Sequence, residues 1–213
     1  EAVEANQTVA ALSPQDAAAQ SNLGNTLKEL GRLDEAEASL RQAIALKSDF
    51  AEAHSNLGVT LKELGRLDEA LASYIQAIVL KPDYAEAHSN LGVTLKELGR
   101  LDEALASYTQ AIALKPDYAE AHNNLGNTLQ ELGRLDDAEA SYNQAIALKP
   151  DYAKAHCNLG NTLQDLGRLD EAEASYTQAI ALKPDFAEAH SNLGNILKEL
   201  GRLDEAEASF TQS

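Results

Sequence analysis

The feature that most constrains the fold of this chain is a block of 34 residues that recurs along it. Two successive copies, 51–84 and 85–118, are identical except at two positions. The differences are Ile75 against Thr109 and Val79 against Ala113. A period of this length is typical of repeated supersecondary units, each of which buries its apolar face against its neighbours.

Each block contains two stretches with the spacing of amphipathic helices. In residues 85–118 the apolar positions of the first stretch are Ala87, Leu91, Leu95 and Leu98, and those of the second are Ala104, Tyr108, Ala111, Ile112 and Leu114. Gly99 separates the two stretches and tolerates the left-handed conformation of a helix end. Pro116 ends the second stretch because it has no N–H to donate. Each block therefore predicts a helix–turn–helix unit.

Two local contacts are also predicted. Asp117 and Glu120 have the spacing of a capping box, so we expect Asp117 to begin the next helix. Gly92 lies inside a predicted helix, where glycine costs about 1 kcal/mol relative to alanine. We therefore expect a packing reason for it, namely a close approach to Ala104 of the second helix.

The register of the block divides the chain into a second-helix remnant, five full repeats and a shortened sixth repeat. The boundaries are 1–16, 17–50, 51–84, 85–118, 119–152, 153–186 and 187–213. We interpret the chain as a fragment of a longer array. Solenoids normally need capping repeats with a polar outer face, and without them we expect end-to-end self-association through the terminal repeats.

The block resembles the tetratricopeptide repeat (TPR) family, over essentially the whole chain. The resemblance rests on Leu91, Gly92, Leu95, Gly99, Ala104, Tyr108, Ala111 and Pro116. It implies an all-α fold, a right-handed superhelical α-solenoid of stacked helix–turn–helix repeats, with the first helices lining a concave groove. The chain departs from the family at His88, where a large apolar residue is common, and at Ser48, which replaces the usual proline.

Charge and composition exclude several kinds of partner. The formal net charge of −17 disfavours nucleic acid and anionic membranes, because both are bound through lysine and arginine. No apolar run is long enough to cross a bilayer. The repeated carboxylates do not assemble a nucleophile, a base and an oxyanion site, so we expect no enzyme activity, no cofactor and no metal. The single cysteine favours a reducing compartment, and we expect a cytoplasmic protein.

Two rows of asparagine mark the polar face of the predicted first helices. The first row has one member in every repeat: Asn22, Asn56, Asn90, Asn124, Asn158 and Asn192. The second row lies one turn further along and is interrupted by Val59 and Val93: Asn25, Asn127, Asn161 and Asn195. An asparagine amide offers one acceptor and two donors, which match the C=O and N–H of a peptide backbone. Helices about 8–10 Å apart would place one asparagine at about every third residue of an extended chain.

The first row is similar to the asparagine ladder in the repeat arm of O-linked N-acetylglucosamine transferases, which implies that the amides hold the main chain of a ligand. The alternative is that each asparagine bonds a neighbouring helix or its own backbone, or survives from recent duplication. On the first interpretation, replacing Asn90 and Asn124 by alanine weakens peptide binding without lowering thermal stability.

We therefore expect a non-catalytic scaffold that binds a protein or peptide in extended conformation. The alternatives are a substrate-recruiting arm of a larger enzyme such as a glycosyltransferase, and a self-assembling structural array. Sequence beyond Ser213 would distinguish the enzyme arm, and size measurements against concentration would test the array.

Other polar residues receive simpler interpretations. The arc opposite the apolar stripe also contains Ser89, and Cys157 takes the corresponding position, so we expect both on the groove face. One histidine per repeat occurs at the edge of the stripe: His54, His88, His122, His156 and His190. These histidines are too far apart to share a zinc ion, and we assign them to packing between repeats. If they become charged, the array is expected to loosen near pH 6.

Overall fold

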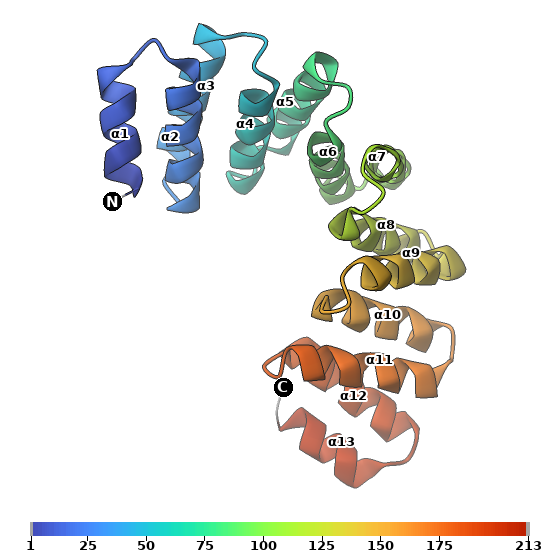
Figure 1. The fold of residues 1–213 in the computed structure, drawn as a ribbon. Helices are drawn as coiled ribbons and strands as arrows, with labels where there is room; N and C mark the ends of the chain where they lie inside the picture. The colour runs from blue at the N-terminus through green and yellow to red at the C-terminus, as the bar shows by residue number, and fades with distance from the viewer. Residues whose placement is uncertain (1, 212–213) are drawn as a thin grey trace. The chain divides into compact units, whose positions relative to one another are not determined.

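The computed structural model describes the backbone of residues 2–211 and the side chains of residues 5–211. Residues 1, 212 and 213, at the outer ends of the first and last predicted parts, lie outside this range. Within residues 2–211 the chain forms thirteen α-helices and no strand (Figure 1). The helices are α1 (Ala2–Leu12), α2 (Ala17–Glu29), α3 (Leu33–Leu46), α4 (Ala51–Glu63), α5 (Leu67–Leu80), α6 (Ala85–Glu97), α7 (Leu101–Leu114), α8 (Ala119–Glu131), α9 (Leu135–Leu148), α10 (Ala153–Asp165), α11 (Leu169–Leu182), α12 (Ala187–Glu199) and α13 (Leu203–Phe210).

The helices pack as consecutive hairpins, α2 on α3, α4 on α5 and so on to α12 on α13. Each second helix also contacts the first helix of the next hairpin within each of two compact units, Glu1–Leu114 and Lys115–Ser213. First helices contact one another as well, α2 with α4 and α4 with α6 in the first unit, and α8 with α10 and α10 with α12 in the second. The expected all-α solenoid of helix–turn–helix repeats is confirmed.

The glycines between the two helices of a hairpin behave as predicted. All six have φ between 72° and 78°, the left-handed region that glycine adopts without strain. At the end of α6, the N–H of Gly99 donates to the carbonyl of Lys96 and the N–H of Arg100 donates to the carbonyl of Leu95, both at 2.9 Å. These bonds use carbonyls that the helix end would otherwise leave unpaired.

The glycine inside each first helix has a different partner from the predicted one. A Cβ atom at Gly92 would lie 2.8 Å from Cε1 of Tyr108, and Ala104 is not among its nearest neighbours. The Tyr108 ring is buried between the two helices and occupies the space that a side chain at Gly92 would need. In the first hairpin the corresponding Gly24 faces Leu40 instead. The packing reason for the glycine is therefore confirmed, but its partner is the aromatic ring.

The predicted capping box at Asp117 and Glu120 is wrong. Helix α8 begins at Ala119, so Tyr118 takes the N-cap position and makes no side-chain cap bond. Asp117 lies in the preceding turn, where its backbone carbonyl accepts from the N–H of Ala119 at 3.1 Å. In α2 the aspartate directly precedes the helix, and there Asp16 accepts from the N–H of Ala18 at 2.9 Å. The intervening aromatic residue thus decides whether the aspartate reaches the helix end.

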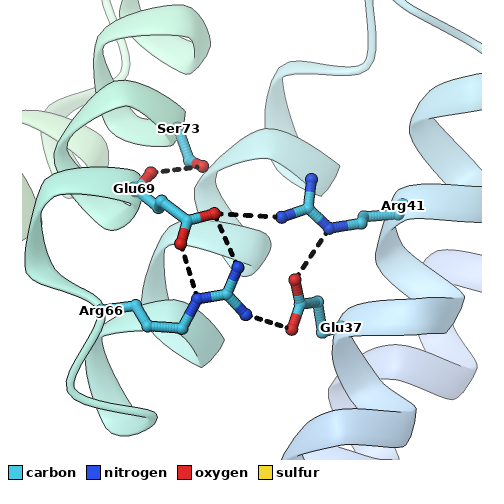
Figure 2. A network of polar contacts seen from close by, with 5 residues as sticks. All are labelled: Glu37, Arg41, Arg66, Glu69 and Ser73. Carbon is cyan, nitrogen blue, oxygen red and sulfur yellow. Dashed lines mark hydrogen bonds and ion pairs between the residues drawn. The ribbon is translucent and has the colours of Figure 1, made fainter.

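Ion pairs join successive hairpins on the side of the second helices. In Figure 2, Arg66 donates to Glu69 of its own helix α5 and to Glu37 of the preceding helix α3, each at 2.6 Å. Arg41 donates to Glu37 at 2.8 Å and to Glu69 at 3.4 Å, so the four side chains form a closed ring of ion pairs. In the second unit, Arg168 pairs with Glu139 and Arg202 with Glu173 in the same way.

Candidate functional site

The first row of asparagines lies on the first helices of both units, and the six side chains differ in exposure. Asn22 on α2 is exposed, whereas Asn158 on α10 is buried, with only 9% of its surface exposed. The other four are half-buried: Asn56, Asn90, Asn124 and Asn192. In the second row Asn195 is exposed, and the remaining members are half-buried: Asn25, Asn127 and Asn161.

In the first unit the amides of the first row make no hydrogen bond within the scaffold. No described residue forms a hydrogen bond with the side-chain amides of Asn22, Asn56 or Asn90. Their backbone carbonyls accept from the threonine one turn later, as Asn90 does from Thr94 at 3.1 Å. The threonine hydroxyl therefore bonds the backbone carbonyl of the asparagine and not its side-chain amide.

In the second unit, two amides of the first row bond to the neighbouring first helix, whereas Asn124 Oδ1 accepts from Asn123 of its own helix at 3.4 Å. Asn158 Nδ2 on α10 donates to Oδ1 of Asn123 and Oδ1 of Asn127 on α8, both at 3.0 Å. Asn192 Nδ2 on α12 donates to Oδ1 of Asn161 on α10 at 2.9 Å. For Asn158 and Asn192 the structure matches the alternative in which the asparagine bonds an adjacent helix.

The second row is tied to buried tyrosines of the second helices. The hydroxyl of Tyr142 donates to Asn127 Oδ1 at 2.8 Å and lies 3.2 Å from Gln130 Oε1. Tyr176 repeats these contacts with Asn161 at 2.7 Å and Gln164 at 3.3 Å. Asn127 and Asn161 accept from both a tyrosine and a first-row asparagine, which fixes the orientation of their amides. The second row therefore contributes to helix packing in this unit.

The sequence analysis missed these tyrosine contacts, although a signal for them exists. Glutamine three residues after the second-row position occurs only in the two repeats that combine an asparagine there with a tyrosine in the second helix. Where valine replaces the asparagine, lysine takes the glutamine position, as in Val59 and Lys62. In that repeat the hydroxyl of Tyr74 is buried and has no hydrogen-bond partner among the described residues, and burial raises its pKa.

The polar arc of the first helix is narrower than predicted. Ser89 is 3% exposed and Cys157 is fully buried, so neither lies on an open face. Both helices pack against first helices of their own unit, α6 against α4 and α10 against α8 and α12. Burial raises the pKa of the Cys157 thiol to about 12, which keeps it protonated and unreactive at neutral pH.

Charged residues near the ends of the first helices pair across repeats. Lys62 Nζ on α4 lies 3.5 Å from Glu97 Oε1 on α6. In α8 and α10 a neutral glutamine takes the lysine position, and Gln130 donates to Asp165 at 3.0 Å. Contacts between adjacent first helices therefore pair part of the charge on this face.

Each histidine holds the loop that precedes its own helix. His88 Nε2 lies 3.1 Å from the carbonyl oxygen of Pro82, in the loop between α5 and α6, and the other four repeat this contact. The ring must donate here, and Nε2 carries a hydrogen in the protonated ring as well. This contact ties each histidine to the connection between two repeats.

Two other kinds of site are absent from the part of the chain that the structure describes. No three His, Cys, Asp or Glu side chains gather there as a metal ion would require. None of the described helices combines the length and the apolar character of a membrane span.

The sequence matches the model of one repeat family, and the fold is similar to several solved structures. A family model described as TPR repeat matches residues 24–65, 60–99, 94–133, 126–167 and 160–201. No curated protein matches the chain. The structure is similar to that of PilW, a type IV pilus biogenesis factor, with a TM-score of 0.85 and 25% identity over 92% of this chain and 91% of PilW.

Two further similar structures have a TM-score of 0.68. YrrB, described as a TPR protein with an unusual peptide-binding site, is 26% identical over 88% of this chain and 97% of its own. MamA is 28% identical over 73% of this chain and 91% of its own.

Proposed function

This chain belongs to the tetratricopeptide repeat family, and on that premise we propose that it is a protein-interaction scaffold that binds a polypeptide segment in extended conformation. The proposed contact residues are the asparagines of the first row, with those of the second row in a supporting role. Recognition is directed at the main chain of the ligand, so the ligand's side chains contribute little.

The observation that carries this proposal is the state of Asn56 and Asn90 in the first unit. Both amides are half-buried on adjacent first helices, and neither bonds to another described residue. An amide held this way can donate to a peptide carbonyl and accept from a peptide N–H without breaking a contact in the scaffold. In the second unit, Asn158 and Asn192 would first have to release their bonds to the adjacent helix. We therefore place the main peptide contacts in the first unit.

The similarity to YrrB supports peptide binding as the function, since that protein has a peptide-binding site and nearly all of its length aligns with this chain. The chemistry of the site is derived from this chain's own residues. Asn56 and Asn90 are flanked by Val59 and Val93, which offer no competing hydrogen bond.

The test compares two double variants. Peptides selected from an array by the parent chain are titrated against Asn56→Ala/Asn90→Ala. Because each hydrogen bond contributes about 0.5–1.5 kcal/mol, losing those of two asparagines weakens binding about 5- to 100-fold. Thermal stability stays unchanged or rises slightly, since alanine is the better helix former. Methylation of the peptide's backbone nitrogens should weaken binding more than substitution of its side chains.

The matched control is Asn158→Ala/Asn192→Ala in the second unit. These substitutions remove helix-to-helix hydrogen bonds, so the melting temperature falls, while peptide affinity falls less than in the Asn56/Asn90 variant. Equal affinity of the parent and the Asn56/Asn90 variant for every selected peptide would refute the proposal.

The same free amides support the alternative that this scaffold is the substrate-recruiting arm of a larger enzyme such as a glycosyltransferase. None of the similar structures described above adds to that alternative. It predicts that the parent chain binds protein substrates of such an enzyme and that the Asn56/Asn90 variant does not.

A further inference from the structure

Helix α5 has a more apolar exposed face than the other second helices. Leu71, like Leu105 of α7, stands where α3, α9 and α11 have a glutamate, which is Glu37, Glu139 or Glu173. One and two turns further, Ile75 and Val79 replace smaller or polar residues of the other repeats and are 46% and 66% exposed. Ile75 and Val79 are also the two positions at which block 51–84 differs from block 85–118, so both differences enlarge the apolar stripe of α5.

A groove runs beside this stripe, between α5 and α7. Its volume is 270 Å³, and its apolar lining includes Leu71 and Ile75 of α5, Leu91 and Leu95 of α6 and Ala106 of α7. Leu71, Ile75 and Val79 follow one another at steps of four residues, so the stripe extends about 12 Å along the helix. The face therefore has the length of two turns of a docked helix.

One repeat earlier, an ion pair joins the corresponding second helices. Glu37 of α3 accepts from Arg66 at 2.6 Å, as Figure 2 shows, and the cavity of 420 Å³ between α3 and α5 is lined in part by the charged side chain of Arg41. At the corresponding place in the next repeat, Leu71 has no carboxylate to offer Arg100. Arg100 pairs with Glu103 of its own helix, and Asp68 raises its pKa further. The replacement of glutamate by leucine thus removes the ion pair between the second helices and adds apolar surface.

The walls of the groove favour a helix over an extended chain as the occupant. They are helices whose backbone N–H and C=O groups are already paired, and the lining is mostly apolar. An extended peptide would leave its own backbone groups unpaired against such a surface, whereas a helix satisfies them internally.

Charge at the rim indicates the composition of that helix. At the rim of the groove, Arg100 faces two carboxylates. It pairs with Glu103, and the charge of Asp68 of α5 also raises the pKa of Arg100. This leaves a surplus of one negative charge beside the groove, in a chain whose net charge is −17. A second copy of this chain would bring like charge, whereas a partner with lysine or arginine beside its apolar stripe is complementary.

We propose that the α5–α7 groove is a second interaction surface, which binds an amphipathic helix of a partner protein with basic residues flanking its apolar stripe. This surface consists mainly of second-helix residues, and the amide rows lie on the first helices, so it does not depend on the peptide-binding function proposed above.

The test uses a triple variant, Leu71→Glu/Ile75→Thr/Val79→Ala, in which every new residue occurs at the same position of another repeat in this chain. The carboxylate introduced by Leu71→Glu would also provide Arg100 with the partner that Arg66 has in Glu37, so the variant keeps or raises the melting temperature. The probe is a fluorescent synthetic helix of about 18 residues with leucines at i, i+3, i+4 and i+7 and flanking lysines. Its controls are a peptide of the same composition with scattered leucines, and one with glutamates in place of the lysines.

The parent chain is expected to bind the basic amphipathic peptide at least about tenfold more tightly than either control peptide, and the triple variant should lose that affinity by about tenfold or more. The Asn56→Ala/Asn90→Ala variant should bind the helix as the parent does, which separates this proposal from the peptide-binding one. The proposal is overturned if the triple variant binds the peptide equally well. It is also overturned if the parent dimerises through this face and the triple variant is monomeric without any peptide preference.

Discussion

At the scale of single residues, one asparagine position serves two purposes in the same chain. Asn90 and Asn158 occupy the same place in their repeats, yet the amide of Asn90 is unpaired and that of Asn158 bonds two asparagines of α8. Asn127 of the second row is available to Asn158, whereas Val59 takes that place for Asn90. A second-row asparagine is not sufficient for the bond, because Asn56 has Asn25 at that place and the buried Oδ1 of Asn25 has no partner among the described residues. A residue that recurs in every repeat therefore need not have one function.

The glycine inside the first helix gives the first prediction. Gly92→Ala improves helix propensity by about 1 kcal/mol, but its new Cβ would lie 2.8 Å from the buried ring of Tyr108. Since the ring has no free space to move into, the clash outweighs the propensity gain, and we expect a net loss of about 1–3 kcal/mol. Chemical denaturation followed by circular dichroism measures the change.

The control for this prediction is taken from the first hairpin, where Gly24 faces a leucine. The smaller side chain introduced by Tyr108→Leu would give way more easily than the ring. Gly92→Ala should therefore cost less in a Tyr108→Leu background than in the parent. An equal cost in both backgrounds would show that the ring is not the source of the clash.

Cys157 gives a second prediction at this scale. The thiol is fully buried, and burial raises its pKa to about 12, so little thiolate forms at pH 8. We expect a thiol reagent such as Ellman's reagent to react slowly with the folded chain and at once in denaturant. Rapid labelling of the native chain at pH 8 would contradict the buried position.

At the scale of secondary-structure elements, the second helices are joined by the ring of Glu37, Arg41, Arg66 and Glu69 (Figure 2). Burial opposes the charge of Glu37, but hydrogen bonds from Arg41 and Arg66 outweigh it and hold the pKa of this carboxyl below its ordinary value. A carboxylate with a lowered folded-state pKa stabilises the fold above its unfolded-state pKa. That contribution is lost as the pH falls through the folded-state pKa.

Glu37→Gln is therefore expected to lower the free energy of unfolding at pH 7, by less than about 1 kcal/mol because the partners are partly exposed. The parent and the variant should converge below the folded-state pKa, where Glu37 is protonated. Urea titrations at several pH values measure this difference. High salt should reduce it at pH 7, and a difference that persists undiminished in acid would argue against an electrostatic origin.

At the scale of the whole molecule, both ends of the described chain expose large apolar side chains. Val9 and Leu12 of α1 are 50% and 79% exposed, and Leu203 of α13 is 64% exposed. Repeat proteins normally cover such faces with polar capping repeats, so we predict concentration-dependent self-association of this chain.

Light scattering from micromolar to millimolar concentration measures that association. Leu12→Ser with Leu203→Ser should shift it to higher concentration, whereas the triple variant of the α5–α7 groove should leave it unchanged. A strict monomer across the whole range would contradict the prediction.

The sequence alone determined the repeat, the helix pairs and the left-handed glycines, because these depend on periodicity and on local backbone preference. Gly99 illustrates this, since its conformation is required by the helix end that it follows. Tertiary packing decided the rest: the ring that faces Gly92, the burial of Ser89 and Cys157, and the pairing of each asparagine. These properties depend on which side chain the neighbouring helix places opposite each residue, so they follow only from patterns that span two helices, such as the glutamine that accompanies the paired asparagine and tyrosine.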